Sequence, residues 1–216
     1  MYKIWNKKLI KKRCVVIGNA SINNYDYLLK EINEDDFLIY CDGGLKHLEK
    51  LKILPNLIIG DFDSFKNPNL DIETIVLPRE KDDTDTMAAV KEGIERGYKD
   101  FLLLGVIGER LDHSLANVSI LLYLDSLNLK GKIIDDYSEM LLVSKKEELV
   151  SDEFSYFSLI NILSNAKGVN VIDAKYPLID ATLPTTYQYS VSNEVLPNKV
   201  SKISLKEGTL LLIKTR

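Results

Sequence analysis

Strand-like apolar runs alternate with helical patterns from residue 14 to about residue 129. Continuous runs rich in Val, Ile and Leu are typical of buried parallel strands, and apolar residues three and four positions apart are typical of amphipathic helices. Their alternation predicts the α/β class, with an open, mostly parallel sheet. The predicted strands are residues 14–17, 37–41, 57–59, 74–77 and 101–104, and the predicted helices are residues 45–51, 86–94 and 113–127.

The pattern changes after Gly131 to short, partly alternating segments, which predict an all-β domain. These segments are residues 132–134, 140–143, 156–163, 168–172, 200–205 and 209–213. Charge supports the division, because residues 146–216 hold eight basic and eight acidic side chains and all the net negative charge lies before them. We therefore predict an α/β domain over residues 1–140 and an all-β domain over residues 141–216.

Composition and charge indicate which kinds of molecule the protein binds. The 216 residues include 28 basic and 32 acidic side chains, a net charge of −4, and 45% are hydrophobic, which is enough for a sizeable core. A negative balance without a Lys/Arg stripe lacks the electrostatic footprint that non-specific nucleic-acid binding needs. The expected partners are small molecules.

The amino-terminal segment gives no sign of a membrane or export function. Residues 1–13 hold six basic side chains but no continuous apolar run, and the clearest uncharged apolar run is residues 114–124. A membrane-spanning helix requires roughly 20 such residues. We expect a cytoplasmic protein without a membrane contact. Cys14 and Cys41 lack CxxC spacing and are expected to be buried free thiols.

Carboxylates follow four of the predicted strands. In an open α/β sheet the ligand binds outside the carboxyl ends of the strands, so these residues matter most for binding. The segments concerned are Asp42-Gly43-Gly44, Gly60-Asp61-Phe62-Asp63-Ser64, Lys81-Asp82-Asp83-Thr84-Asp85, and the stretch from Gly105 through Gly108, Glu109, Arg110 and Asp112 to His113. We expect them to converge on one edge of the sheet.

Asp61 and Asp63 are the strongest metal-ligand candidates. In extended chain, residues two apart point the same way, so the two carboxylates can share one cation. Mg²⁺ prefers oxygen ligands and typically takes one or two carboxylates together with substrate phosphates. The alternative is that both are turn residues. Uncompensated carboxylates at one edge repel each other, which favours the metal site.

The next two segments predict phosphate contacts. Gly105-x-x-Gly108 leaves a strand and precedes a helix, and Arg110 follows as a bidentate phosphate partner. Lys81 adds a second cation. The alternative for Asp82 and Asp85 is a helix cap and a first-turn charge. The chain has no G-x-x-x-x-G-K-[ST] and no G-x-G-x-x-G segment, which disfavours ordinary P-loop and dinucleotide folds.

The two histidines differ in their expected roles. His113 is a base, a purine contact or a polar residue at a helix start, and the sequence leaves these three open. His47 follows Lys46 in a predicted helix and is expected to be an exposed surface residue.

Taken together, these segments and Ser192-Asn193-Glu194 resemble the thiamine pyrophosphokinase family in order and spacing, over about residues 14 to 213. The resemblance implies a nucleotide-binding α/β domain, a β-sandwich that binds thiamine, and a homodimer with active sites at the subunit contact. The implied reaction moves the pyrophosphoryl group of ATP to the primary alcohol of thiamine, giving thiamine diphosphate and AMP.

The resemblance also implies roles for particular residues. Asp61, Asp63 and Asp85 match the Mg²⁺ site, with Asp42 and Asp82 beside it. Together with Arg110 these three form the catalytic set, and either Asp61 or Asp63 is a candidate to accept the alcohol proton. Ser192 and Asn193 match the thiamine-binding segment. The residues that match nucleotide-binding positions are Asp42, Gly43, Lys81, Asp82, Thr84, Gly105, Gly108, Arg110, Asp112, His113 and Asn117.

The β domain departs from the family pattern, since no tryptophan lies in it and the segment before Ser192 is not glycine-rich. Tyr187 or Tyr189 could supply an aromatic face by cation–π contact, or both could be ordinary strand residues. Two other functions remain alternatives. One is a pyrophosphokinase for another hydroxymethyl heterocycle such as a pterin, and the other is a non-catalytic sensor of nucleotide or thiamine.

Overall fold

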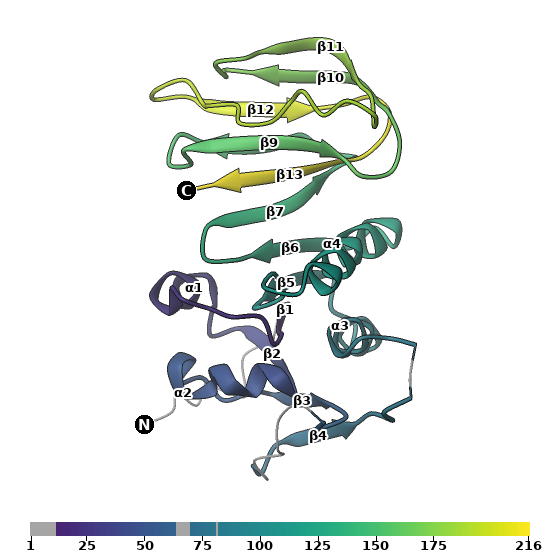
Figure 1. Ribbon diagram of the computed structural model, residues 1–216. Helices are drawn as coiled ribbons and strands as arrows, with labels where there is room; N and C mark the ends of the chain where they lie inside the picture. The colour runs from purple at the N-terminus through teal and green to yellow at the C-terminus, as the bar shows by residue number, and fades with distance from the viewer. Residues whose placement is uncertain (1–11, 64–69, 81) are drawn as a thin grey trace. The chain divides into compact units, whose positions relative to one another are not determined.

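A computed structural model of the chain describes residues 12–63, 70–80 and 82–216. The chain divides into two compact units, Met1–Asp136 and Tyr137–Arg216. The first combines helices with parallel strands, and the second is built from antiparallel strands and turns (Figure 1). The predicted class, an α/β part followed by an all-β part, is confirmed.

The first unit contains six strands in the order β4-β3-β2-β1-β5-β6, and every neighbouring pair is parallel. Four of them are buried over all or nearly all of their length, which explains their continuous apolar sequences. The strands are β1 (Arg13–Ile17), β2 (Asp36–Cys41), β3 (Leu57–Gly60), β4 (Glu73–Val76), β5 (Asp100–Leu104) and β6 (Lys130–Ile134).

Helices cover both faces of this sheet, with α1 and α2 on one face and α3 and α4 on the other (Figure 1). Alternate strand residues such as Val15 and Leu38 pack with Leu28 of α1 and Leu48 of α2 in one buried cluster. On the other face, the ring of Phe101 lies against Gly93 of α3. The helices are α1 (Tyr25–Glu31), the 3₁₀ helix η1 (Gly43–His47), α2 (Leu48–Leu51), α3 (Asp85–Glu95) and α4 (Leu111–Ser126).

Two elements of this unit differ from the prediction. Helix α1 was not predicted, because it spans seven residues and buries only Leu28 completely, so it has too little apolar periodicity to detect. Residues 132–134 were grouped with the all-β segments, but the strand they belong to, β6, pairs in parallel with β5. Its first three residues are exposed or half-buried, which interrupts the continuous apolar run of a parallel strand.

The strands of the second unit form two antiparallel sets, in the orders β7-β13-β9 and β11-β10-β12-β8. They enclose a common core that includes Phe157, Leu159, Val171 and Leu212. Strands β8 and β11 were not predicted, because each is short and mostly exposed or half-buried. The strands are β7 (Ser138–Val143), β8 (Glu148–Ser151), β9 (Tyr156–Asn161), β10 (Ala166–Ile172), β11 (Leu178–Leu183), β12 (Val200–Ser204) and β13 (Leu210–Thr215).

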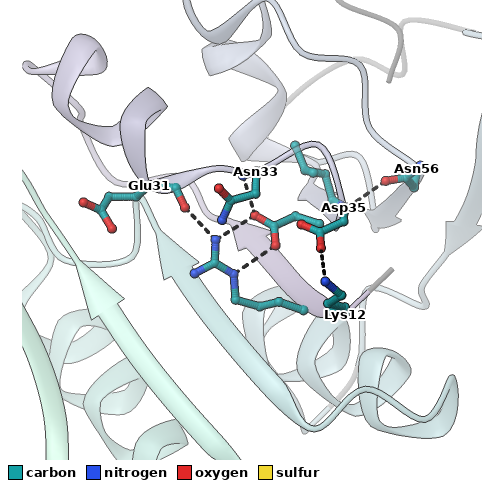
Figure 2. Close-up of polar contacts among 8 residues, drawn as sticks. Lys12, Glu31, Asn33, Asp35 and Asn56 are labelled. Atoms are coloured by element: carbon teal, nitrogen blue, oxygen red, sulfur yellow. Dashed lines mark hydrogen bonds and ion pairs between the residues drawn. The ribbon is translucent and has the colours of Figure 1, made fainter. Parts of the chain in front are cut away.

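An ion pair fixes the start of β1 against the start of β2. The guanidinium of Arg13 donates to both carboxylate oxygens of Asp36, at 3.0 and 2.7 Å, and also to the carbonyl oxygen of Glu31 at 2.6 Å. Asp36 is 1% exposed and also accepts from the backbone N–H of Asn33 (Figure 2). The nearby pair of Lys12 with Asp35, at 3.2 Å, has a largely exposed lysine.

Two further expectations concern the core and the helices. Cys14 and Cys41 are free and buried, as predicted. Burial raises the pKa of both thiols above the usual value, which keeps them protonated. Within the described part of the chain, none of the helices has the length and apolarity that crossing a membrane requires.

Candidate active site

A cavity of about 560 Å³ lies in the first unit, at the carboxyl ends of its strands. In the sheet, β1 has β2 as its neighbour on one side and β5 on the other. The loops after β1 and β5 therefore face each other at the carboxyl ends of the two strands. The residues that line it are Asn19, Ala20, Cys41, Asp42, Lys46, Asp61, Asp63, Thr84, Asp85, Thr86, Gly105, Val106, Gly108, Glu109, Arg110, His113, Ser114 and Asn117.

Three carboxylates gather in this cavity. Asp42 follows β2, Asp61 follows β3, and Asp85 begins α3; one oxygen from each lies within 4.8 Å of the others. Burial is the largest cause of the raised pKa of Cys41, and the negative charges of Asp85 and Asp42 add to it. The cluster therefore creates a negative potential, which a bound cation would offset.

The donor set suits a hard divalent cation such as Mg²⁺, since all three groups offer oxygen and two are only half-buried. Asp61 and Asp85 belong to the predicted ligand set, and Asp42 is the third member of this cluster. Asp63, the remaining predicted ligand, is exposed and lines the same cavity. The backbone N–H of Asp63 donates to the carboxylate of Asp61 at 3.2 Å.

Glycines let the backbone approach the cluster. A Cβ on Gly60 would lie 2.6 Å from the Cβ of Asp42, and a Cβ on Gly44 would overlap the carbonyl oxygen of Ile17. Asp42 begins η1, and its carboxylate accepts from the backbone N–H of Gly43. The Asp-Gly-Gly segment is thus required by packing as well as by the position of the carboxylate.

Two side chains of α4 form hydrogen bonds with the loop between β5 and α4. Ser114 accepts from the backbone N–H of Gly108 at 3.0 Å, and its hydroxyl lies 3.0 Å from the carbonyl oxygen of Arg110. Asn117 donates to the carbonyl oxygen of Val106 at 2.8 Å. Gly105 has a φ of +61°, which favours glycine. The predicted phosphate loop is therefore a fixed wall of the cavity.

Arg110 and His113 line the cavity from the start of α4. The Arg110 guanidinium donates to the Asp112 carboxylate at 3.2 and 2.5 Å, and both side chains are about two-thirds exposed. This pairing lowers the pKa of Asp112 to about 2 and raises that of Arg110. Asp112 orients the guanidinium and does not itself line the cavity.

The remaining nucleotide candidates fall into three groups. Thr84 lines the cavity, and its hydroxyl accepts from the Met87 N–H at 3.2 Å, so it caps α3. Gly43 is buried and does not line the cavity. Asp82 is exposed, does not line the cavity and is not the residue that caps α3. Lys81 lies outside the described residues, as does Ser64.

Sequence reasoning missed one wall of the cavity. Asn19 and Ala20 come from the loop after β1, and Lys46 comes from η1. The Lys46 ammonium donates to the carbonyl oxygen of Asn19, which brings a cation to the cavity beside Glu109. The expectation that His47 is exposed is wrong: it is 1% exposed, because η1 turns it under the β1 loop. Asn19 and Ala20 could have been predicted as cavity residues, because they follow the carboxyl end of a predicted strand.

Ser192 and Asn193 lie in the second unit and differ in accessibility. Ser192 is exposed, has a φ of +58°, and its backbone N–H donates to the Ser158 hydroxyl. Asn193 is 4% exposed. Its side-chain oxygen accepts from the N–H groups of Tyr176 and Glu194, and its side-chain nitrogen donates to the Tyr176 carbonyl oxygen at 2.8 Å. Asn193 therefore joins two loops of the unit.

Two tyrosines precede this segment. The rings of Tyr187 and Tyr189 have centroids 5.6 Å apart at 36°, and the side chains are 68% and 42% exposed. The Tyr189 hydroxyl donates to the Thr182 carbonyl oxygen at 2.9 Å. Neither residue lies in a strand, so the reading of both as alternating strand residues is wrong.

Replacing Asn193 with alanine is expected to lower the free energy of unfolding by about 1 to 3 kcal/mol, because the hydrogen bonds of its buried side-chain amide to Tyr176 and Glu194 are lost. Ser192→Ala is the matched control, since its exposed hydroxyl should contribute less than about 0.5 kcal/mol. Denaturant unfolding of both variants gives the comparison. Equal stabilities would contradict the structural role of Asn193.

Two protein-family models match this chain, one after the other along the sequence. A family model described as the catalytic domain of thiamin pyrophosphokinase matches residues 28–133. A second, described as the vitamin B1 binding domain of thiamin pyrophosphokinase, matches residues 141–210. The chain belongs to the thiamine pyrophosphokinase family. The predicted resemblance to this family is confirmed.

Individual proteins resemble this chain in sequence or in fold. A thiamine pyrophosphokinase of Bacillus subtilis is 27% identical over 191 residues, covering 85% of this chain and 89% of that protein. The crystal structure of thiamine pyrophosphokinase from Bacillus subtilis has a TM-score of 0.82 at 24% identity, over 94% of this chain and 99% of the other. For the yeast structure, the TM-score is 0.76 at 17% identity, over 100% and 91%.

Proposed function

We propose that the protein transfers the pyrophosphoryl group of ATP to the primary alcohol of thiamine, forming thiamine diphosphate and AMP. Membership of the family supports the reaction class, and the cavity supports the use of a polyphosphate. One cavity holds the cluster of Asp42, Asp61 and Asp85 together with the cations of Lys46 and Arg110. This arrangement, which suits a metal-bound triphosphate, carries the proposal.

The residues of the cavity have distinct tasks in this proposal. Transfer of a phosphoryl group through a loose transition state depends mainly on alignment and charge, so no covalent nucleophile is needed. Asp42, Asp61 and Asp85 would hold Mg²⁺, which when bound neutralises charge on the phosphate oxygens. Arg110, oriented by Asp112, binds phosphate oxygens as a planar fork.

Asp63 is the better placed of the two candidate bases. It lines the cavity and is not one of the three carboxylates of the cluster. We assign it the task of accepting the proton from the thiamine alcohol. His113 and Asn117 line the same cavity and are proposed to contact the nucleotide.

Incubation of the protein with ATP, Mg²⁺ and thiamine tests the proposal. We expect equal amounts of AMP and thiamine diphosphate, separated by chromatography. Formation of ADP with thiamine monophosphate would contradict pyrophosphoryl transfer. Turnover of a pterin alcohol but not of thiamine would favour the other heterocycle, and binding without any product would favour a sensor.

Replacing Arg110 with lysine is expected to raise the apparent KM for ATP about tenfold, equivalent to about 1.4 kcal/mol, and to lower turnover. The charge is kept, but a point ammonium cannot grip two phosphate oxygens at once. Arg96→Lys is the control, because Arg96 pairs with Glu73 and Glu92, none of which lines the cavity. Steady-state kinetics in which both variants match the parent would remove Arg110 from the phosphate site.

The homodimeric state, the shared active site and the cytoplasmic location stay predictions. Light scattering under dilute conditions is expected to give about twice the chain mass of 24.5 kDa. A fully active monomer would contradict a shared site. Contacts of Ser192 and Asn193 with thiamine also stay predictions, and the buried position of Asn193 favours Ser192 as the residue that touches the ligand.

A further inference from the structure

A buried histidine ring beside the cavity has no task in the proposed chemistry. His47, the last residue of η1, is 1% exposed. Its Nε2 lies 2.9 Å from the carbonyl oxygen of Ala20, and its Nδ1 lies 2.8 Å from the hydroxyl of Tyr25 in α1. One ring nitrogen therefore contacts the loop after β1, and the other contacts the first residue of α1.

These two contacts define the state of the ring. A carbonyl oxygen only accepts, so Nε2 carries the proton and donates to Ala20. The Nδ1 atom then accepts from the Tyr25 hydroxyl. Burial, followed by the charge of Lys46, lowers the pKa of His47 to about 4, so the ring is neutral near pH 7. One tautomer thus links α1, η1 and the β1 loop.

The linked loop is a wall of the nucleotide cavity. Asn19 and Ala20 line the cavity, and the backbone N–H of Ala20 donates to the Gly105 carbonyl oxygen at 2.7 Å. Ala20 is therefore held by Gly105 through its N–H and by His47 through its carbonyl. A Cβ on Gly105 would lie 3.4 Å from Nε2, so the ring also packs beneath the phosphate loop.

The far end of the same loop is fixed separately. The carboxylate of Asp136 accepts from the backbone N–H groups of Asn23 and Asn24, at distances between 2.8 and 3.0 Å, and from the side chain of Asn23. Loss of the His47 contact would therefore remove one of the contacts that hold the Asn19–Ala20 portion, while the contacts of Asp136 near the start of α1 stay in place. The expected defect is local to the cavity.

We propose that His47, oriented by Tyr25, is a positioning residue that fixes the Asn19–Ala20 wall for nucleotide binding. The inference rests on the proposed function in that the bound nucleotide is ATP. His47 does not touch the reacting atoms, because Ala20 lies between its ring and the cavity. Its removal is expected to weaken binding of the nucleotide and leave binding of thiamine unchanged.

A set of four variants tests this role. We expect Tyr25→Phe to raise the apparent KM for ATP about fivefold and His47→Leu about 20-fold, with the KM for thiamine within twofold of the parent. His47→Gln, whose amide can still donate to Ala20, is expected to recover part of the loss. Tyr98→Phe is the control for removing a hydroxyl, since Tyr98 stacks on Phe37 and does not line the cavity.

The two side chains should act as one unit. We expect Tyr25→Phe to have little further effect in a chain that already carries His47→Leu, because the hydroxyl acts through the ring. Equal rises in both KM values, or a lower melting temperature with unchanged KM values, would overturn the positioning role. So would full additivity of the two substitutions.

Direct binding separates this inference from the proposed function. Calorimetry with Mg²⁺ and the α,β-methylene analogue of ATP, whose α–β bridge the reaction cannot break, requires no turnover. We expect the same order of affinities, with the parent tightest and His47→Leu weakest. A parent that binds the analogue but forms no thiamine diphosphate would overturn the proposed function alone. A parent that does not bind it, or variants that bind equally well, would overturn the inference.

Discussion

Asp61→Asn and Asp85→Asn are each expected to lower turnover about 100- to 1,000-fold, the loss typical of removing one aimed electrostatic group from a reaction site. Asparagine keeps the shape of the side chain but removes the negative charge from a cluster whose oxygens lie within 4.8 Å. Steady-state rates at saturating Mg²⁺ measure the effect. Both variants should remain folded.

Asp82→Asn is the matched control, because Asp82 belongs to the same acidic stretch but is exposed and outside the cavity. A second measurement addresses the cation itself. Mg²⁺ should raise the melting temperature of the parent and of Asp82→Asn, since a ligand bound only by the folded state stabilises it, but not that of Asp61→Asn. Turnover of Asp61→Asn within twofold of the parent would exclude the cluster as the metal site.

Asp36→Ala is expected to lower the free energy of unfolding by about 3 to 5 kcal/mol, because it leaves the Arg13 guanidinium largely buried without its carboxylate. The substitution also removes the acceptor for the N–H of Asn33. Denaturant unfolding measures the change. The effect belongs to stability and not to catalysis, since neither residue lines the cavity.

A neighbouring pair supplies the control for this substitution. Asp35→Ala removes the partner of Lys12, whose side chain is 78% exposed, and exposed ion pairs contribute about 1 kcal/mol or less. The two carboxylates are adjacent in sequence, so burial is the main difference between them. Similar losses from both variants would show that the Arg13 pair contributes no more than a surface contact.

Much of the fold follows from local sequence. The buried strands from β1 to β5 were predicted because both faces of a parallel sheet are covered, which produces unbroken apolar runs. The helix predicted at residues 45–51 is instead η1 followed by α2, because the Asp42 carboxylate and the tight approach of Gly44 to Ile17 shape its first turn. That difference depends on a contact 27 residues away in sequence.

The site was predictable to the extent that it lies at strand ends. Asp42, Asp61 and Asp85 converge because parallel strands bring their carboxyl ends to one edge. Which three carboxylates meet was not predictable, since the i, i+2 pairing of Asp61 with Asp63 assumed extended chain. Phe62 between them has a φ of +56°, so the chain is not extended at this point. Lys46 and His47 were missed because their roles depend on the fold of the β1 loop.

The pairing of β1 with β5 has a consequence for how the protein acquires its activity. Cys14 lies opposite Phe101, so two neighbouring central strands are separated by most of the first unit in sequence. Closing so long a loop is entropically unfavourable, and such contacts slow folding. The cavity walls follow these two strands, so ligand-binding competence should emerge late during refolding, after helical signal has returned. A chain growing on the ribosome has no complete cavity until β5 is available.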